Sequence, residues 1–220
     1  MKIIENLWQV GGAELTAPGD AAVYLVRFDD EAALIDAGCG AGHDQLVRNI
    51  SRCLPVTAKL THLFLTHCHY DHTGGAEAIR QHFGCKIAAH ELDVAFLEQG
   101  DNSVTAASWY GAELMPLKVD HKIRADTETI IVGSGKVQSH HCPGHSPGSI
   151  VYVIEMNLTK VLFGQDIHGP LHPSLLSNRK DYLESLKFIL GLEADILCEG
   201  HFGVFRGRQE IDSFIRSYLD

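Results

Sequence analysis

Residues 66–75 read THCHYDHTGG, and three histidines and one aspartate fall within this short stretch. The stretch follows an apolar run at 60–65 that predicts a β-strand, and it precedes apolar positions at helical spacing over 74–83. Neutral imidazole and carboxylate are the side chains that borderline divalent ions such as zinc prefer as ligands. A lone histidine near a strand end is usually a surface or core residue, but four ligand-type side chains at this spacing predict a metal site.

The spacing within this stretch divides its ligands into two pairs. Side chains two residues apart point to the same side of an extended chain, so His67 and His69 are expected to face one ion. Asp71 and His72 then lie on the turn after the strand, where they can face a second ion. A short turn cannot close a coordination shell by itself, so further ligands must come from elsewhere in the chain.

Three later positions have the right context for those further ligands. His145 lies in a loop rich in proline and glycine, HCPGHSPGS, between two predicted strands. Asp166 follows the apolar run at 160–163, and His201 follows the apolar run at 196–198. Loops at the carboxyl ends of strands converge on a ligand crevice in layered α/β proteins, so these three side chains are candidate ligands.

The predicted strands fall into two blocks, and segments with helical spacing flank each block. This order favours an α/β protein in which two sheets pack face to face with helices outside, a four-layer sandwich. No linker or repeat interrupts the chain, so residues 1–220 are expected to form one domain. The predicted strands are 3–10, 24–28, 32–35, 60–65, 86–89, 129–132, 136–140, 149–154, 160–163 and 196–198. The predicted helices are 44–54, 74–83, 179–190 and 209–219, and 91–114 reads as irregular helix.

Composition and charge exclude several classes of protein. The 220 residues are 45% hydrophobic, which is too apolar for a disordered chain, and no apolar run is long enough to span a membrane. The net charge of −10 does not suit a protein that grips nucleic-acid phosphates, so the expected partner is a small-molecule substrate. The six cysteines are scattered, and the N-terminus does not read as an export signal. Both features predict a cytoplasmic protein with reduced thiols.

The HxHxDH run, followed by Gly-His, Asp and Gly-His after successive strands, resembles the metallo-β-lactamase-fold hydrolase superfamily. The resemblance covers nearly the whole chain, and it implies the αβ/βα sandwich that the segment order favours. It also implies two bound divalent ions, most commonly zinc, with iron or manganese as alternatives. By this resemblance the first ion is held by His67, His69 and His145, the second by Asp71, His72 and His201, and Asp166 bridges the two.

The resemblance also implies a reaction. Two ions about 3.5–4 Å apart share a water and make it a hydroxide near neutral pH, and that hydroxide attacks an acyl or phosphoryl centre. Asp71 beside this water is expected to orient it and carry its proton, which makes Asp71 the candidate catalytic residue. Asp36 lies where the family has a carboxylate that fixes a ligand imidazole; the alternative role is a turn-forming aspartate before glycine.

Within the superfamily, the sequence resembles the glyoxalase II-like branch most. A flavodiiron oxidoreductase would carry glutamate in place of His69, and the extra helical part that grips glutathione in typical glyoxalase II is not expected here. The predicted function is therefore hydrolysis of a small-molecule ester, thioester or lactone. The alternatives are a persulfide dioxygenase-like oxidoreductase with one iron, a phosphodiesterase-type hydrolase of the same fold, and a metal-bound binding protein without catalysis.

Three residues outside the ligand set are candidate substrate contacts. His168 lies two residues after Asp166, in a loop that can overhang the ions. Trp109 and Tyr110 lie in the irregular segment 91–114 and can form an apolar wall of the substrate site. Core packing, or a contact between two copies of the chain in a homodimer, is the alternative role of these two aromatic residues.

Overall fold

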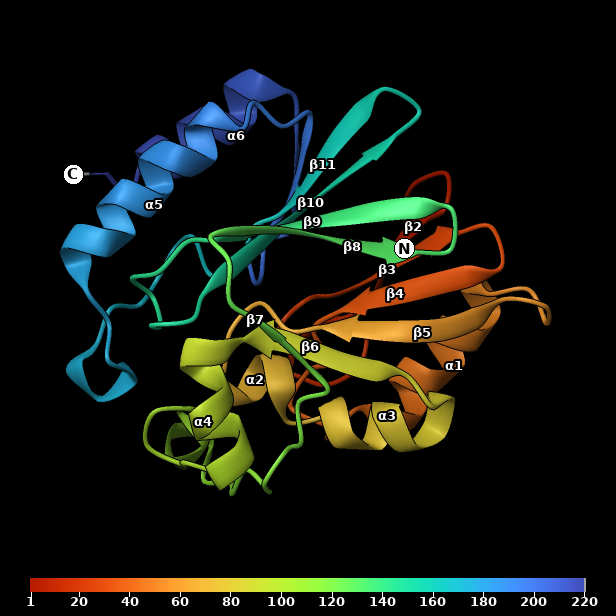
Figure 1. The fold of residues 1–220 in the computed structure, drawn as a ribbon, viewed down its shortest axis with the longest axis horizontal. Coiled ribbons are helices and arrows are strands. Elements are labelled where there is room, and N and C mark those ends of the chain that lie inside the picture. The colour runs from red at the N-terminus through yellow and green to blue at the C-terminus, as the bar shows by residue number, and fades with distance from the viewer. Residues whose placement is uncertain (220) are drawn as a thin grey trace.

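The computed structural model describes residues 1–219 as two β-sheets packed face to face, with helices on both outer surfaces. Figure 1 shows the helices α5 and α6 over the outer face of one sheet and α1, α3 and α4 on the opposite side of the molecule, beneath the other sheet. This arrangement confirms the four-layer α/β sandwich that the order of segments predicts.

The first sheet has seven strands in the order β1 to β7. Strands β1 to β4 are antiparallel neighbours, whereas β4 to β7 run parallel to one another. The strands are β1 Lys2–Ile4, β2 Leu7–Gly11, β3 Val23–Phe28, β4 Glu31–Ile35, β5 Lys59–Phe64, β6 Lys86–His90 and β7 His121–Ile123. The helices of this half are α1 His43–Cys53, α2 Tyr70–Thr73, α3 Ala76–Phe83, α4 Glu91–Gln99 and the 3-10 turn η1 Ala107–Tyr110.

The second sheet has six strands in the order β13, β12, β11, β10, β9, β8. Only β11 and β12 are parallel neighbours, and the other pairs are antiparallel. The strands are β8 Thr127–Val132, β9 Gly135–His141, β10 Ile150–Met156, β11 Thr159–Phe163, β12 Ile196–Cys198 and β13 Val204–Arg206. The helices of this half are α5 Arg179–Gly191, α6 Arg208–Arg216 and the 3-10 turn η2 Pro173–Leu175.

The central strands are apolar on both faces because each sheet packs against the other sheet on one face and against helices on the other. On β10, Tyr152 and Ile154 pack in the core between the two sheets, whereas Val151 and Val153 pack against the outer helices. Successive residues of a strand point to opposite faces, so one strand contributes to both cores. A buried strand of this kind reads as a continuous apolar run, which is how the sequence presents it.

The structure differs from the sequence prediction at four places. The irregular helix expected over 91–114 is the helix α4, which ends at Gln99, and the 3-10 turn η1. The strand expected over 3–10 is two strands, β1 and β2, because Asn6 takes a left-handed backbone with φ 62° and turns the chain. The edge strands β7 and β13 were not predicted, since three residues are too few to show a period. The turn after β5 contains one helical turn, α2, ahead of the expected helix.

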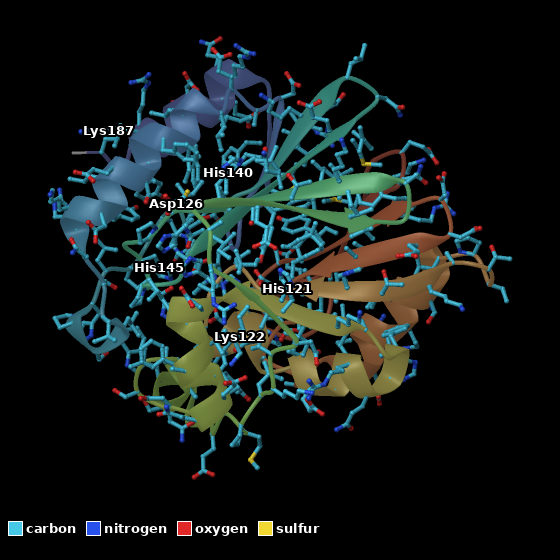
Figure 2. The ribbon with its side chains drawn as sticks, in the orientation of Figure 1. His121, Lys122, Asp126, His140, His145 and Lys187 are labelled. Carbon is cyan, nitrogen blue, oxygen red and sulfur yellow. The ribbon has the colours of Figure 1, made fainter. Side chains whose placement is uncertain are left out.

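The predicted ligand-bearing segments follow β5, β9, β11 and β12. Figure 2 shows His145, which follows β9, near the end of the two sheets where α4 begins. Within residues 1–219 there is no helix with the length and hydropathy needed to cross a bilayer.

Candidate metal centre

The turn after β5 is fixed by an aspartate from the neighbouring strand. Asp36, directly after β4, accepts hydrogen bonds from the backbone N–H of Thr66 at 2.8 Å and from its hydroxyl at 2.8 Å. Asp36 has a left-handed backbone with φ 61°, a conformation that aspartate tolerates better than most residues. These contacts set the direction in which the chain enters the histidine-rich stretch.

The first ligand group consists of His67, His69, His145 and Asp166, all buried. The three rings pack around one point, with centroid separations of 4.4 Å for His67 and His69, 4.5 Å for His69 and His145, and 4.8 Å for His67 and His145. Asp166 Oδ2 lies 3.5 Å from His145 Nε2 and 4.0 Å from His67 Nε2. The strand spacing predicts that His67 and His69 face the same side, and the structure brings them together.

The second ligand group consists of Asp71, His72, Asp166 and His201. Asp166 Oδ1 lies 3.1 Å from His72 Nε2 and 3.4 Å from His201 Nε2. Asp71 Oδ2 lies 3.2 Å from His201 Nε2 and 3.8 Å from His72 Nε2. Asp166 therefore presents one carboxylate oxygen to each group, and the residues predicted as seven ligands meet in two adjacent clusters.

The unpaired polar atoms of this region fit bound cations. The Nε2 atoms of His67, His69, His72 and His145 are buried without a hydrogen-bond partner, and so is Oδ1 of Asp166. Buried polar atoms normally have partners because leaving one unpaired costs about 1–3 kcal/mol. Five such atoms from ligand-type side chains at one place are satisfied together if cations bind between them.

Two histidines of the first group are held neutral by their surroundings. Burial is the main cause that lowers the pKa of His67 well below its ordinary value, and the neighbouring rings of His72 and His69 add to it. Burial also lowers the pKa of His69 well below its ordinary value, and His145 adds to it. A neutral imidazole keeps a lone pair for an ion, so these rings need not lose a proton to coordinate one.

In the second group, neighbouring carboxylates raise the pKa values of the histidines instead. Burial opposes a proton on His72, but the carboxylates of Asp166 and Asp36 outweigh it and hold its pKa well above the ordinary value. Burial also opposes a proton on His201, but the carboxylates of Asp166 and Asp71, at 3.4 and 3.2 Å from its Nε2, raise its pKa to about 10. Burial favours a neutral Asp71, yet His72 and His201 outweigh it and lower the pKa of that carboxyl. A cation that binds this group must displace protons.

Asp36 also orients a ring of the second group. Its Oδ2 lies 2.8 Å from Nδ1 of His72, so the proton of that ring is held at Nδ1 and Nε2 faces the cluster. The structure thus places Asp36 where the resemblance implies, against a predicted ligand. The turn-forming role applies as well, since Asp36 is the left-handed residue that leads from β4 toward Thr66.

Asp93 holds two ligand-bearing segments together, and it is not among the site residues that the sequence predicts. This aspartate of α4 is fully buried, and its Oδ2 accepts hydrogen bonds from the backbone N–H of Cys68 at 2.9 Å and the hydroxyl of Ser146 at 2.6 Å. Its Oδ1 accepts one from the N–H of Gly148 at 2.6 Å. Cys68 lies between His67 and His69, and Ser146 follows His145, so Asp93 positions the histidines of the first group.

Glu199 is a second buried carboxylate that is not among the predicted site residues. Its Oε2 accepts hydrogen bonds from the backbone N–H of His201 at 2.7 Å and of Phe202 at 2.8 Å. Its Oε1 lies 2.9 Å from Nδ1 of His168, whose ring is 5.1 Å from the ring of His201. The available signal was an acidic residue directly after the buried strand β12. The structure brings the predicted substrate contact His168 beside the second group.

The other two predicted substrate contacts lie on η1. Tyr110 is 45% exposed, and burial together with the neighbouring charge of Asp71 raises the pKa of its hydroxyl. Trp109 is 51% exposed, and its ring lies 5.3 Å from the ring of His172 in an edge-to-face arrangement. Neither side chain is part of the core, so the core-packing alternative for these two residues does not hold.

Gly200 keeps the space beside Asp166 open. A Cβ atom at this position would lie 2.3 Å from Oδ1 of Asp166 and 3.1 Å from Cε1 of His72. Any side chain here would push the shared carboxylate away from the second group. The Gly-His spacing in the sequence is therefore a packing requirement of the cluster.

The chain is similar in sequence to a known family and to several of its members. Residues 16–201 match the family model described as "Metallo-beta-lactamase superfamily". The chain is 28% identical to the acyl-coenzyme A thioesterase MBLAC2 of Gallus gallus over 97% of this chain and 78% of that protein. It is 31% identical to the hydroxyacylglutathione hydrolase GloC of Haemophilus influenzae over 64% of this chain and 63% of that protein.

A bacterial relative and two solved structures extend the comparison. The probable metallo-hydrolase YqgX of Bacillus subtilis is 28% identical over 63% of this chain, and the match spans only 62% of the relative's own length. The B3 metallo-β-lactamase BLEG-1 superposes with a TM-score of 0.78 at 26% identity, over 95% of this chain and 99% of that one. The di-zinc B3 enzyme LRA-12 from an Alaskan soil metagenome has the same fold, with a TM-score of 0.78 at 22% identity over 100% of this chain and 89% of that one.

Proposed function

The chain belongs to the metallo-β-lactamase superfamily, and from this premise we propose that it hydrolyses a small-molecule thioester or ester, lactones included, with two divalent metal ions. The observation that carries the proposal is the division of the ligands into two groups that share Asp166. Its two carboxylate oxygens face different groups, at 3.5 Å from His145 Nε2 and 3.1 Å from His72 Nε2. A carboxylate in this position suits a bridge between two ions.

The chemical types of the donors favour zinc. Five imidazoles and two carboxylates make up the two groups, and zinc binds both types, with iron and manganese as alternatives. When bound, two such ions supply an activated water and positive charge beside the substrate oxygen. A thioester or ester is favoured over a phosphodiester because two matched relatives are named as thioesterase and hydroxyacylglutathione hydrolase.

Asp71 is the proposed catalytic residue. Burial favours a neutral acid, but His72 and His201 lower its pKa, so Asp71 is a carboxylate near neutral pH. A carboxylate beside the attacking water can orient it and accept its proton at Oδ1 or Oδ2. The Tyr110 side chain lies close enough to this carboxylate for the charge of Asp71 to raise the pKa of the Tyr110 hydroxyl.

His168 is the proposed polar contact for the substrate. Glu199 fixes its ring through Nδ1, at 2.9 Å, and the side chain is 18% exposed beside His201. Its Nε2 is then available for a hydrogen bond with a bound molecule. Histidine in this position contacts the substrate without being a member of either ligand group.

The test is an activity panel on zinc-loaded protein. Acetyl and acyl thioesters, a lactone, a phosphodiester and a persulfide are offered to the wild-type chain and to Asp166→Ala. We expect thioester or ester hydrolysis that disappears in the variant, together with two zinc ions per wild-type chain. Oxygen consumption with the persulfide on one iron per chain, or turnover of the phosphodiester alone, contradicts the proposal.

A further inference from the structure

Three exposed aromatic side chains lie on segments that adjoin the two ligand groups. Trp109, Tyr110 and Phe202 are 51%, 45% and 58% exposed, and they come from two segments far apart in the chain. Single exposed apolar side chains are common and need no explanation, whereas a group of them beside a reactive site indicates a binding surface. We call these three side chains the aromatic rim.

The part of the rim on η1 is attached directly to the metal-binding stretch. The backbone N–H of Tyr70, between His69 and Asp71, donates a hydrogen bond of 2.7 Å to the carbonyl of Thr105. The carboxylate of Asp101 accepts from the N–H groups of Ser103 and Val104, which closes the turn that leads to η1. Trp109 and Tyr110 are therefore held on a hydrogen-bonded segment at a fixed position relative to Asp71.

Phe202 is anchored on the other side of the second group. Its backbone N–H donates to the buried carboxylate of Glu199 at 2.8 Å, and its ring lies 4.9 Å from the ring of His168. The next residue toward the N-terminus is the ligand His201. Phe202 and Tyr110 thus lie beside two ligands, His201 and Asp71, whose side chains are 3.2 Å apart.

A third segment, residues 168–172, contacts both parts of the rim, since the ring of His168 lies against Phe202 and the ring of His172 against Trp109. The loop that carries His168 continues to Pro170, whose carbonyl lies 3.0 Å from Nδ1 of the ligand His145. Two residues later, His172 contacts the ring of Trp109. Each segment that borders the rim is therefore bonded to a ligand or to the neighbour of a ligand, which fixes the rim before any substrate arrives.

We propose that the aromatic rim binds an apolar acyl chain of the substrate, next to the carbonyl that reacts at the ligand groups. This inference rests on the proposed function and names the substrate class: acyl compounds with a long hydrocarbon chain rather than short, polar ones. The occupant must be joined to the reacting carbonyl because the rim begins at residues adjacent to Asp71 and His201. Aromatic side chains supply a large apolar contact at little cost in conformational entropy.

The test uses binding of alkyl hydroxamates, which chelate metal ions but are not turned over as thioesters are. Affinities of acetohydroxamate, butyrohydroxamate and octanohydroxamate are measured by calorimetry on the zinc-loaded wild-type chain and on Trp109→Ala/Phe202→Ala. Each buried methylene contributes up to about fourfold in affinity, so we expect the wild-type chain to bind the longest probe roughly fiftyfold or more tightly than the shortest. In the double variant this gain should fall by at least about tenfold.

The controls separate the rim from the metal site and from the fold. Acetohydroxamate should bind the double variant and the wild-type chain alike, which shows that the ligand groups are intact. Phe188→Ala removes another exposed aromatic ring, 45% exposed on α5, and should keep the full gain with chain length. Figure 2 labels the preceding residue, Lys187, on the outer side of that helix.

The outcomes that overturn the inference are distinct from failure of the proposed function. Equal gains with chain length in the wild-type chain and the double variant, or no gain in either, exclude the rim as an acyl-binding surface. A wild-type dimer that becomes monomeric in the double variant, seen by light scattering, assigns the rim to a contact between two copies. Chain-length-dependent binding without hydrolysis of any thioester or ester contradicts the proposed function, but it still supports the rim as a binding surface for an apolar chain.

Discussion

The two ligand groups share Asp166 but differ in charge, burial and support. The first has three imidazoles around one carboxylate oxygen, and the side chains of His67 and His145 are 0% and 1% exposed. The second has two imidazoles and two carboxylates, and the side chain of His201 is 31% exposed. The first group is therefore enclosed. The second is partly open toward solvent, and its histidines already form ion pairs with Asp71 and Asp166.

The difference assigns separate tasks to the two groups. An enclosed site in which burial keeps His67 and His69 neutral favours a permanently held ion with a fixed geometry. The group that is partly exposed, beside Asp71, His168 and the aromatic rim, is where a substrate can reach an ion. Two supporting carboxylates follow the same division, because Asp93 positions segments of the first group and Glu199 positions His201 of the second. Asp36 serves both groups, since it contacts His72 directly and holds Thr66 beside His67.

Removing the shared carboxylate should have the largest effect, because both groups lose a ligand. In Asp166→Ala we expect turnover to fall more than about 10³-fold and both ions to be lost. In His201→Ala, which affects one group, we expect a smaller loss of turnover and retention of the first ion. Elemental analysis beside kcat checks both variants, with Asp212→Ala on α6 as a control. An Asp166 variant that keeps both ions shows that this residue does not bridge.

Changing Asp71 should separate proton transfer from metal binding. In Asp71→Asn the amide oxygen still offers a ligand, but the group cannot accept a proton near neutral pH. We expect kcat to fall by about 10²–10⁴-fold while most of the second ion is retained. The measurement is kcat across pH together with metal content of the same preparation. Parallel loss of metal and activity would mean that Asp71 acts only as a ligand, and unchanged activity would place the proton acceptor elsewhere.

Removing Asp93 should weaken one group and spare the other. In Asp93→Ala the donors on Cys68, Ser146 and Gly148 lose their acceptor, so we expect zinc affinity of the first group to fall about 10–100-fold. Affinity of the second group should change little. Competition with a chelating dye measures the two steps, and the d–d spectrum of the cobalt-loaded variant reports whether the first group has lost its geometry.

A matched control keeps the Asp93 prediction distinct from general destabilisation. Glu91→Ala removes an exposed carboxylate from the same helix and should leave both affinities unchanged. Asp93→Asn should not restore the wild type, because its amide N–H₂ would face hydrogen-bond donors. Equal weakening of both groups in Asp93→Ala contradicts a selective role.

The smallest expected effect is a difference between the two groups in how zinc affinity depends on pH. The pKa of His201 is raised to about 10 and that of His72 lies well above its ordinary value, so between pH 6 and 8 both rings favour a proton that an ion must displace. Affinity of the second group should therefore fall as pH falls, by about tenfold per unit for each proton displaced. His67 and His69 have lowered pKa values and are neutral in this range, so the first group should change less. Zinc titrations at pH 6, 7 and 8 test this, and equal slopes would contradict it.

The ligand positions could be predicted because each is tied to local sequence. His67, His69, Asp71 and His72 follow one strand, and His145, Asp166 and His201 follow others, so strand order alone predicts that they converge. The superfamily and the four-layer fold implied by this pattern are confirmed. The turn at Asn6 was missed because an apolar run does not show which residue will adopt a left-handed backbone.

The supporting carboxylates could not be predicted from local pattern. Asp93 lies 53 positions before its partner Ser146, and Glu199 lies 31 positions after His168. Each contact depends on how two distant segments pack, which periodicity does not report. Asp93 has one local signal, an acidic residue on the same helix face as Leu97, and both residues are buried.

Each ligand group draws residues from both halves of the chain, and this has a consequence for synthesis. During translation the segment with His67, His69, Asp71 and His72 is made early. Asp166 and His201 follow only after most strands of the second sheet have been made. A nascent chain therefore offers imidazoles and a carboxylate without the rest of either group, and it can hold an ion only loosely. Tight metal loading is in this way an event of the finished chain, and a truncated product that lacks residue 201 would be recognisable by the ion it fails to retain.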